Sequence, residues 1–292
     1  MLPWTRRLLS SNHLRPFSRA FSMSVFSSKR LENKTVLVTG ASAGIGEATA
    51  ILYAKAGANV IIAARRQDAL ATVLESLKAA HKESGVQAGG KFAAVQLDVS
   101  NREDVNSLWT KVPQELREVD ILVNNAGFVK GVERIGEIAD QDIDDMFATN
   151  VIGLISVTQL LVKDFKARGT GHIINIGSVA GREPYAGGGI YCATKHAVKS
   201  FTGSLLRELV DTQIRVTEIQ PGMVETEFSN VRYRGDKEAA KNVYKGLEPL
   251  TAQDIAEEIV WASSRPPRVN LAEVYVLPVN QASPGIVYRS QS

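Results

Sequence analysis

A tyrosine and a lysine stand four residues apart in the run Y-C-A-T-K, which extends from Tyr191 to Lys195. On an α-helix, this spacing places the two side chains on one face, close enough to interact. An isolated phenol has a pKa of about 10, which is too high for a base at neutral pH, but a nearby ammonium favours the phenolate. The pair can therefore accept a proton from an alcohol and, in the reverse direction, donate one to a carbonyl.

Two further polar residues fit the same chemistry. Ser178 lies 13 residues before Tyr191, at the end of an apolar run, where it could hold the substrate oxygen beside the phenol. Asn150 lies in a long helical pattern and could hold a water that connects Lys195 to solvent. Spacing alone is weak support, because a second such pair, Y-R-G-D-K at 233–237, is interrupted by glycine and has no serine at a preceding strand end. The residues that we assign to catalysis are Asn150, Ser178, Tyr191 and Lys195.

The other reactive side chains do not compete with this assignment. The four histidines and the single cysteine are not clustered at the spacing of metal ligands, so we predict no metal site. Cys192 has no partner for an intrachain disulfide, which is compatible with a reducing compartment and excludes a disulfide-built secreted fold. With 44% hydrophobic and 22% charged residues, the 292-residue chain has the composition of a globular protein with one large α/β domain or two small ones.

Strand-like and helix-like patterns alternate after residue 34, which is typical of a parallel sheet covered by helices. We predict strands at about 35–38, 59–63, 91–97, 121–123, 172–176, 214–219 and 273–276. We predict helices at about 43–56, 67–82, 101–111, 142–167, 191–210 and 252–263, and a loop or short helical excursion at 225–250. Because no linker or repeat interrupts this series, residues 32–292 are expected to form one α/β domain, a doubly wound seven-stranded parallel sheet of the Rossmann type with helices on both faces. The polar motifs all fall at the carboxyl ends of its strands, where such sheets bind ligands.

A glycine-rich turn directly follows the first predicted strand, in T-V-L-V-T-G-A-S-A-G-I-G at 35–46. Glycines at this spacing let the backbone turn sharply, approach a phosphate and pack a helix against a strand. The helix that follows offers unpaired N–H groups and a positive dipole end, which suit a pyrophosphate. Such turns also occur where nothing binds, so the assignment depends on the motifs downstream. The residues assigned to the phosphate site are Gly40, Ser42, Gly44, Ile45 and Gly46.

Two arginines follow the second predicted strand, where a dinucleotide site reads the adenosine ribose. An NAD site would place an acidic residue about 20 residues beyond the glycines, whereas Arg65 and Arg66 suit the 2′-phosphate of NADP. The alternative is that both are solvated residues before a helix. After the third strand, Asp98 and Val99 are placed to contact the adenine, although Asp98 could instead cap the following helix. The run expected to close the floor beneath the adenosine ribose is Asn124, Asn125, Ala126 and Gly127.

The first 31 residues differ from the rest in charge. They contain six basic residues and no acidic one, so leaving them out changes the formal net charge from +3 to −3. An arginine- and serine-rich leader without acids is typical of a mitochondrial transit peptide; the alternative is a cytoplasmic protein with a disordered extension, or translation from Met23. The remainder has no electrostatic reason to bind nucleic acid. The longest uncharged run, at 146–162, contains polar residues and is expected to be a buried helix, so we predict no integral membrane segment.

These motifs, in this order, resemble the short-chain dehydrogenase/reductase family over residues 33–283. The runs that carry the resemblance are T-G-A-S-A-G-I-G, N-N-A-G, Y-C-A-T-K and P-G-M-V-E-T, together with Asn150 and Ser178. The resemblance implies that an Asn, Ser, Tyr, Lys tetrad falls on the four residues assigned above to catalysis. It also implies that Val224 and Thr226, after Pro221 and Gly222, fix the nicotinamide carboxamide, and that Tyr191 and Lys195 contact the cofactor.

A narrower resemblance points to the NADP-dependent 3-hydroxy acid dehydrogenases within this family. It rests on A-A-R-R, on S-V-A-G-R-E-P-Y-A-G-G-G-I-Y-C-A-T-K, on V-E-T-E-F-S-N-V-R-Y-R-G-D and on N-Q-A-S-P near the end. The subgroup oxidises L-serine, L-allo-threonine and related 3-hydroxy acids. The resemblance implies a homotetramer whose main interface uses the helices at about 142–167 and 191–210. Soluble members of the subgroup lack such a basic leader, so the resemblance does not predict the cellular compartment of this protein.

A carboxylate substrate needs a cation near the reacting centre. Arg232, in the excursion, is the first candidate and Arg182, after the fifth strand, is the second; either could instead be a solvated surface charge. Two alternatives to a 3-hydroxy acid dehydrogenase stay open. One is a carbonyl or 3-ketoacyl reductase of the same family, and the other is a non-catalytic NADP-binding protein.

Overall fold

The computed structural model describes residues 28–290. The predicted leader at 1–31 therefore lies outside the described residues except for its last four, which form the 3-10 helix η1 (Ser28–Leu31). Leu31 is buried against the main core. The first strand begins four residues later, at Thr35.

Seven parallel strands form a single sheet in the order β3-β2-β1-β4-β5-β6-β7. The strand order reverses beside β1, as a doubly wound sheet requires, so the predicted fold class is confirmed. Every residue of β1, β2 and β4 is buried, which explains why these strands are continuous apolar runs. The strands are β1 (Thr35–Thr39), β2 (Asn59–Ala64), β3 (Phe92–Gln96), β4 (Ile121–Asn124), β5 (Thr170–Ile176), β6 (Gln213–Pro221) and β7 (Glu273–Val276).

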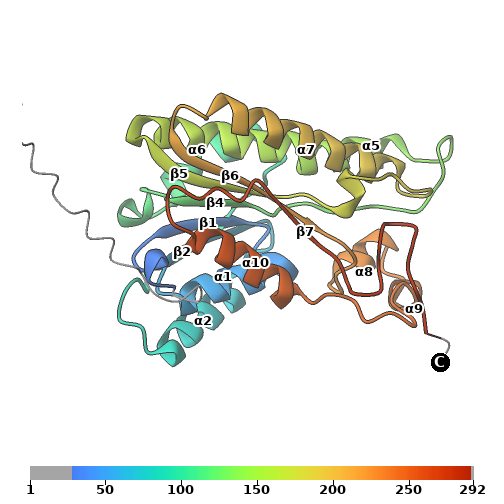
Figure 1. Cartoon of the computed structure of the whole chain (residues 1–292), viewed down its shortest axis with the longest axis horizontal. Coiled ribbons are helices and arrows are strands. Elements are labelled where there is room, and N and C mark those ends of the chain that lie inside the picture. The colour runs from blue at the N-terminus through green and yellow to red at the C-terminus, as the bar shows by residue number, and fades with distance from the viewer. Residues whose placement is uncertain (1–27, 291–292) are drawn as a thin grey trace, which may run out of the picture.

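Helices cover both faces of the sheet (Figure 1). One face packs against α1 (Gly44–Lys55), α2 (Gln67–Ser84) and α10 (Ala252–Ser264), which bury side chains such as Tyr53, Leu77 and Ile259. The other face packs against α3 (Arg102–Asn106), α4 (Leu108–Lys111), α6 (Leu154–Arg168) and α7 (Gly189–Glu208). The remaining short helices are the 3-10 turns η2 (Gln114–Leu116) and η4 (Val179–Gly181).

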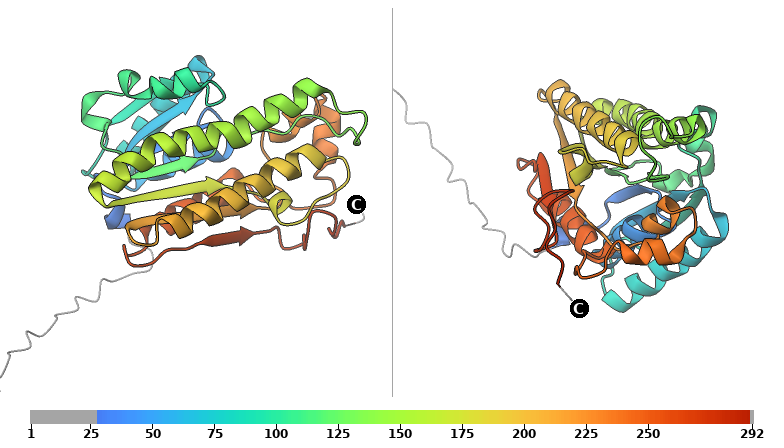
Figure 2. Two further views of the ribbon diagram at one scale, coloured as in Figure 1. Left: turned by 90° about the horizontal axis from the view of Figure 1, so that it is seen from above. Right: turned by 90° about the vertical axis from the view of Figure 1, so that its right-hand side faces the viewer.

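The predicted helix at 142–167 is longer than expected and is not uniform. It begins with α5 (Asp140–Phe147), continues through the π-helical segment η3 (Ala148–Gly153) and ends with α6. Figure 2 shows it running beside α7. At Gly153 an added Cβ would lie only 2.8 Å from the carbonyl oxygen of Val99, so glycine is needed where this helix meets the turn after β3. The predicted helix at 101–111 is likewise divided, into α3 and α4, at Ser107.

Among residues 28–290, the helix Asp140–Arg168 is the one long and apolar enough to cross a membrane by length and composition. Half of its most apolar window is buried inside the fold. Core helices of globular proteins pass the same test, and Leu161 and Phe165 are indeed fully buried against the sheet.

The excursion between β6 and α10 contains two short helices, α8 (Phe228–Arg232) and α9 (Lys237–Asn242). In Figure 1 they lie at the end of the sheet where the strands terminate. The C-terminal segment packs on the same excursion, because Arg289 donates to the carbonyl oxygens of Val243 and Lys245. We call residues 225–250 the roof, since they close one side of the cavity described next.

Candidate functional site

A cavity of about 590 Å³ lies at the carboxyl ends of the strands. It brings together most of the residues that the sequence assigned to cofactor and catalysis, although these are spread from residue 40 to residue 226. The assigned residues that line it are Gly40, Ser42, Gly44, Ile45, Arg65, Arg66, Asp98, Val99, Asn125, Ala126, Gly127, Ser178, Tyr191, Lys195, Pro221, Gly222, Val224 and Thr226. Four assigned residues do not line it: Gly46, Asn124, Asn150 and Arg232.

The glycine turn is built around close backbone contacts. Gly40 and Gly44 have φ values of +65° and +60°, which favour glycine, and a Cβ on Gly40 would lie 2.7 Å from Ala126 Cα. A Cβ on Gly46 would lie 2.5 Å from the carbonyl oxygen of Gly40, so this third glycine packs helix on turn instead of facing the cavity. Helix α1 begins at Gly44 without a side-chain cap, which leaves its first N–H groups for an anion.

Asn125 fixes this turn from the neighbouring strand. Its amide nitrogen donates to the carbonyl oxygens of Thr39 and Gly40, at 3.0 and 3.1 Å. The Thr39 hydroxyl accepts from the backbone N–H groups of Asn125 and Ala126 in return. We call residues 39–46 and 124–127 the cofactor floor, because these contacts join the two strand ends into one surface.

Asn124 has a different place from its neighbours. Its side chain is buried and donates to Thr158 and Asn175, at 2.8 and 2.9 Å, on the face of the sheet covered by α6 and α7. Within the predicted floor, Asn124 therefore supports the strand end from below, and Asn125, Ala126 and Gly127 face the cavity.

The two arginines at the ribose end also differ. Arg66 donates to the hydroxyl and the carbonyl oxygen of Ser42, so it braces the glycine turn. The Arg65 guanidinium lines the cavity and makes no hydrogen bond or ion pair with any residue of the described chain, 28–290. An unpaired guanidinium in this position suits the 2′-phosphate of NADP.

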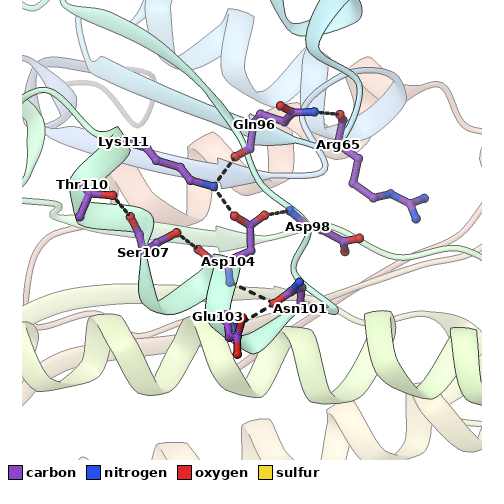
Figure 3. Close-up of polar contacts among 9 residues, drawn as sticks. All are labelled: Arg65, Gln96, Asp98, Asn101, Glu103, Asp104, Ser107, Thr110 and Lys111. Carbon is purple, nitrogen blue, oxygen red and sulfur yellow. Dashed lines mark hydrogen bonds and ion pairs between the residues drawn. The ribbon is translucent and has the colours of Figure 1, made fainter.

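A polar cluster fixes the turn that presents Asp98 (Figure 3). The Asp98 backbone N–H donates to the Asp104 carboxylate at 2.7 Å, and Lys111 binds that carboxylate and the carbonyl oxygen of Gln96. The Gln96 amide in turn donates to the carbonyl oxygen of Arg65. In Figure 3 the side chains of Arg65 and Asp98 extend to the same side, away from this cluster.

Asp98 does not cap the next helix, α3. Asn101 caps α3 by accepting from the N–H groups of Glu103 and Asp104. The Asp98 carboxylate instead accepts from the backbone and hydroxyl of Ser100, and Asp98 lines the cavity.

Tyr191 and Lys195 lie in the first turns of α7, and both are buried. The Lys195 ammonium donates to the carbonyl oxygen of Ile176 at 2.7 Å and lies 5.8 Å from the centre of the Tyr191 ring. Ser178 follows β5 at the same strand end, and its hydroxyl accepts from the N–H of Ala180 at 3.1 Å. Serine, phenol and amine therefore meet at one end of the cavity.

Burial dominates the protonation of this pair. It raises the pKa of the Tyr191 phenol, and the neighbouring Tyr185 phenol raises it further, whereas Ser178 and Arg232 lower it. Burial also lowers the pKa of Lys195 to about 8, an effect that the Glu218 carboxylate partly opposes. Without cofactor, desolvation thus outweighs the attraction between ammonium and phenolate that the sequence suggested. Additional positive charge beside the Tyr191 ring is therefore needed to stabilise its phenolate.

Asn150 lies in the π-helical segment η3 and joins three parts of the site. Its amide nitrogen donates to the carbonyl oxygen of Phe128 at 2.8 Å and to the hydroxyl of Thr194 at 3.2 Å. Its oxygen accepts from the N–H of Phe128. Asn150 therefore fixes the loop after β4 to the helix of Tyr191 and Lys195, and the water link to Lys195 stays a prediction.

The two arginine candidates for a substrate carboxylate lie in different places. Arg182 donates to Gln220 and Glu273, stacks on the ring of Tyr275 and does not line the cavity; as a carboxylate ligand it stays a prediction. Arg232 lies close enough to the reacting end to lower the Tyr191 pKa.

The terminal nitrogens of Arg232 donate to the Tyr185 hydroxyl and to the Gly187 carbonyl oxygen, each at 3.1 Å. Its Nε is buried without a partner. Arg232 therefore stays a prediction as the carboxylate ligand.

Several lining residues were not found from the sequence. Phe128, Phe228 and Val231 form an apolar wall, and the Phe228 ring meets the Tyr191 ring edge-on at 5.6 Å between centres. Lys130 and Asp145 line the cavity as an ion pair with 2.8 Å between nitrogen and oxygen. None of them belongs to a local pattern, so only the tertiary structure identifies them. Among residues 28–290, no three His, Cys, Asp or Glu side chains form a group that could hold a metal.

Comparison with known proteins identifies one family. The sequence pattern described as short chain dehydrogenase matches residues 34–237. The NADP-dependent 3-hydroxy acid dehydrogenase of Schizosaccharomyces pombe is 41% identical over 264 residues, which cover 90% of this chain and 99% of that protein. The serine 3-dehydrogenase of Rhizobium radiobacter is 40% identical over 256 residues, covering 87% and 98%.

Solved structures agree with the sequence comparisons. A closed form of serine dehydrogenase complexed with NADP+ superposes with a TM-score of 0.80 at 39% identity and covers 88% of this chain and 99% of that one. The serine dehydrogenase from Escherichia coli superposes with a TM-score of 0.71 at 36% identity and covers 85% and 99%.

Proposed function

This chain belongs to the short-chain dehydrogenase family, and from that premise we propose that it transfers hydride between NADP(H) and the C3 hydroxyl or carbonyl of small 3-hydroxy acids. L-serine, L-allo-threonine and 3-hydroxybutyrate-like acids are the proposed substrates. One observation carries the proposal: Ser178, Tyr191 and Lys195 share a single cavity with the glycine turn and with Arg65.

The residues present fit NADP. The uncapped start of α1 and the close backbone approach at Gly40 form a seat for the pyrophosphate, and the Arg65 guanidinium suits the 2′-phosphate. Asp98 and Val99 would contact the adenine, and Val224 and Thr226 would hold the carboxamide. When bound, the nicotinamide accepts or donates the hydride, and its oxidised ring adds positive charge.

In the oxidative direction, Tyr191 as phenolate takes the hydroxyl proton while the hydride leaves C3. Ser178 holds the substrate oxygen beside the phenol, and Lys195 stabilises the phenolate. In the reverse direction, Tyr191 donates the proton to a carbonyl. Burial of the site excludes water, and holding both reactants in line lowers the barrier. Arg232 is proposed to pair with the substrate carboxylate; because its terminal nitrogens bind Tyr185 and Gly187 and it does not line the cavity, substrate binding would have to replace these contacts.

The experiment is steady-state oxidation by NADP+ of L-serine, L-allo-threonine, 3-hydroxybutyrate and a long-chain 3-hydroxyacyl thioester. We expect the small free acids to have the highest kcat/KM, because they present a carboxylate to Arg232. A preference for the thioester, or turnover only of neutral carbonyl compounds with NADPH, would instead support the carbonyl or ketoacyl reductase alternative. NADP binding without turnover of any of these substrates would support a non-catalytic protein.

We also propose a homotetramer in the mitochondrion. The tetramer would use the helices Asp140–Arg168 and α7, and half of the most apolar window of the former is not buried within one chain. The mitochondrial assignment depends on the basic, acid-free leader at 1–31, most of which lies outside the described residues. Light scattering tests the assembly, and localisation of a fluorescent protein fused to residues 1–31 tests the compartment. A diffuse cytoplasmic signal would favour translation from Met23.

A further inference from the structure

The roof covers the reacting end of the cavity but has little structure of its own. It contributes Thr226, Phe228 and Val231 to the lining, while its helices α8 and α9 contain only five and six residues. Helices of this length are not stable without tertiary contacts. The position of the roof must therefore be set by what it binds on the rest of the molecule.

Arg234 makes the ion pairs that join the roof to the start of the helix Asp140–Arg168 and to the loop after β4. Its guanidinium donates to the Asp142 carboxylate of α5 at 2.6 Å and to the Glu133 carboxylate at 3.2 Å. The neighbouring carbonyl oxygen of Arg232 accepts from the N–H of Gly131 at 2.9 Å. Arg234 has a φ of +54°, a left-handed conformation that is unfavourable for arginine, so its contacts must compensate for the backbone strain.

Asp142 is the central residue of this contact. It is 4% exposed, although it carries a charge, and its two carboxylate oxygens are taken by Arg234 and by the Lys130 ammonium at 3.2 Å. The Arg234 hydrogen bond is the largest cause of the lowered pKa of Asp142. A buried carboxylate needs its partners, because removing one leaves an uncompensated charge. Asp142 therefore joins α5, the roof and the loop after β4.

The contact extends to the cofactor end of the cavity. Lys130 also binds Asp145 at 2.8 Å, and both residues line the cavity. Arg65 lines the same cavity, and its positive charge contributes to lowering the pKa of Asp145. Lys130 thus connects Asp142, and through it the roof, to the lining of the cavity.

We propose that Asp142 is a positioning residue: through Arg234 and Lys130 it holds the roof closed over the substrate, and so sets substrate affinity without contacting substrate or cofactor. The kinetic part of this proposal rests on the proposed dehydrogenase reaction. The structural part, that Asp142 holds residues 225–250, does not.

The test variant is Asp142→Asn, which keeps the side-chain shape and removes the charge. We expect the KM for the 3-hydroxy acid to rise at least about tenfold, because a displaced roof misplaces the substrate. The kcat should change less, and the dissociation constant of NADP+ should stay within about twofold, because the cofactor floor is untouched. Amide hydrogen exchange of residues 225–250 should become faster in the cofactor-free protein.

Asp144→Asn is the matched control, because Asp144 lies on the same helix and is exposed, and its carboxylate forms no hydrogen bond or ion pair within residues 28–290. The double variant of Asp142→Asn with Arg234→Gln should be less impaired than the sum of the two single variants, because both changes remove the contact between Asp142 and Arg234. If Asp142→Asn does not fold, Arg234→Gln alone gives the same readouts, because the Arg234 side chain is 48% exposed.

The proposal is overturned if the roof of Asp142→Asn, or of Arg234→Gln, exchanges at the rate seen in Asp144→Asn. If no substrate is turned over by the unmodified protein, the proposed function fails while the exchange measurement still decides the role of Asp142.

Discussion

The cofactor floor and the roof enclose the same cavity but are held in place by different interactions. In the floor, Gly40, Gly46 and Asn125 meet through backbone and amide groups at the ends of fully buried strands. In the roof, short helices are fixed by charged side chains, of which Arg234 is about half exposed. Floor geometry is therefore part of the folded core, whereas roof geometry can change without unfolding. Cofactor binding and substrate binding should consequently respond to different mutations.

The strongest test removes the chemistry that lies between the two regions. Tyr191→Phe is expected to lower kcat by about 10³-fold, because the proton acceptor is lost while the ring still packs against Phe228. The NADP dissociation constant, measured by protein fluorescence, should change little. A variant that retained a tenth of the activity would show that another group moves the proton.

Gly46→Ala should disturb the cofactor floor and leave the roof unchanged. The new Cβ would lie 2.5 Å from both the Gly40 carbonyl oxygen and the Asn125 amide, so the turn must shift. Overpacking of this kind costs roughly 1–3 kcal/mol, and we expect lower thermal stability together with weaker NADP binding. Gly285→Ala is the control, since a Cβ there meets nothing within 4 Å. Unchanged NADP affinity in Gly46→Ala would contradict the close packing of the floor.

Arg65 and Arg66 should affect the binding of NADP and NAD differently. Arg65→Ala should weaken NADP binding about 10- to 100-fold and leave NAD binding unchanged, because a charge-assisted hydrogen bond to the 2′-phosphate is lost. Arg66→Ala should weaken both cofactors, because Arg66 holds Ser42 in the glycine turn. The measurement is the KM for each cofactor. Equal effects of Arg65→Ala on NADP and NAD would remove its assigned role.

The smallest expected effect concerns Lys195 and pH. Its pKa of about 8 in the folded protein is below the value of about 10.4 expected when unfolded, so the unfolded chain binds more protons between these values. The stability of the cofactor-free protein should therefore rise from pH 8 to pH 10.5, relative to a variant that lacks this group. At pH 7 the free energy of unfolding of Lys195→Met should exceed that of the unmodified protein. This difference should shrink by roughly 2–3 kcal/mol from pH 7 to pH 10 in urea unfolding. The exposed Lys55→Met is the control, and a difference that does not vary with pH would contradict the burial of this amine.

Much of the site could be predicted because it depends on local patterns. The turn at 35–46 and the Tyr191 and Lys195 pair are encoded by glycine conformations and helical spacing, which need no knowledge of distant residues. The alternation of apolar strands and helices then places their ends at one edge of the sheet. The same logic could not reveal the partners of Arg182, because Gln220 and Glu273 lie far from it in the sequence.

The sequence by itself thus determined the fold class, the glycine turn and the catalytic pair. Only the tertiary structure decided which side chains close the cavity around them. It separated Asn124 from Asn125, introduced the π-helical segment at Asn150 and paired Arg234 with Asp142, 92 residues away in the chain. The physical reason is range: backbone conformation and hydrophobic periodicity are set by neighbours in the sequence, whereas a buried charge pair exists only where folding brings its members together.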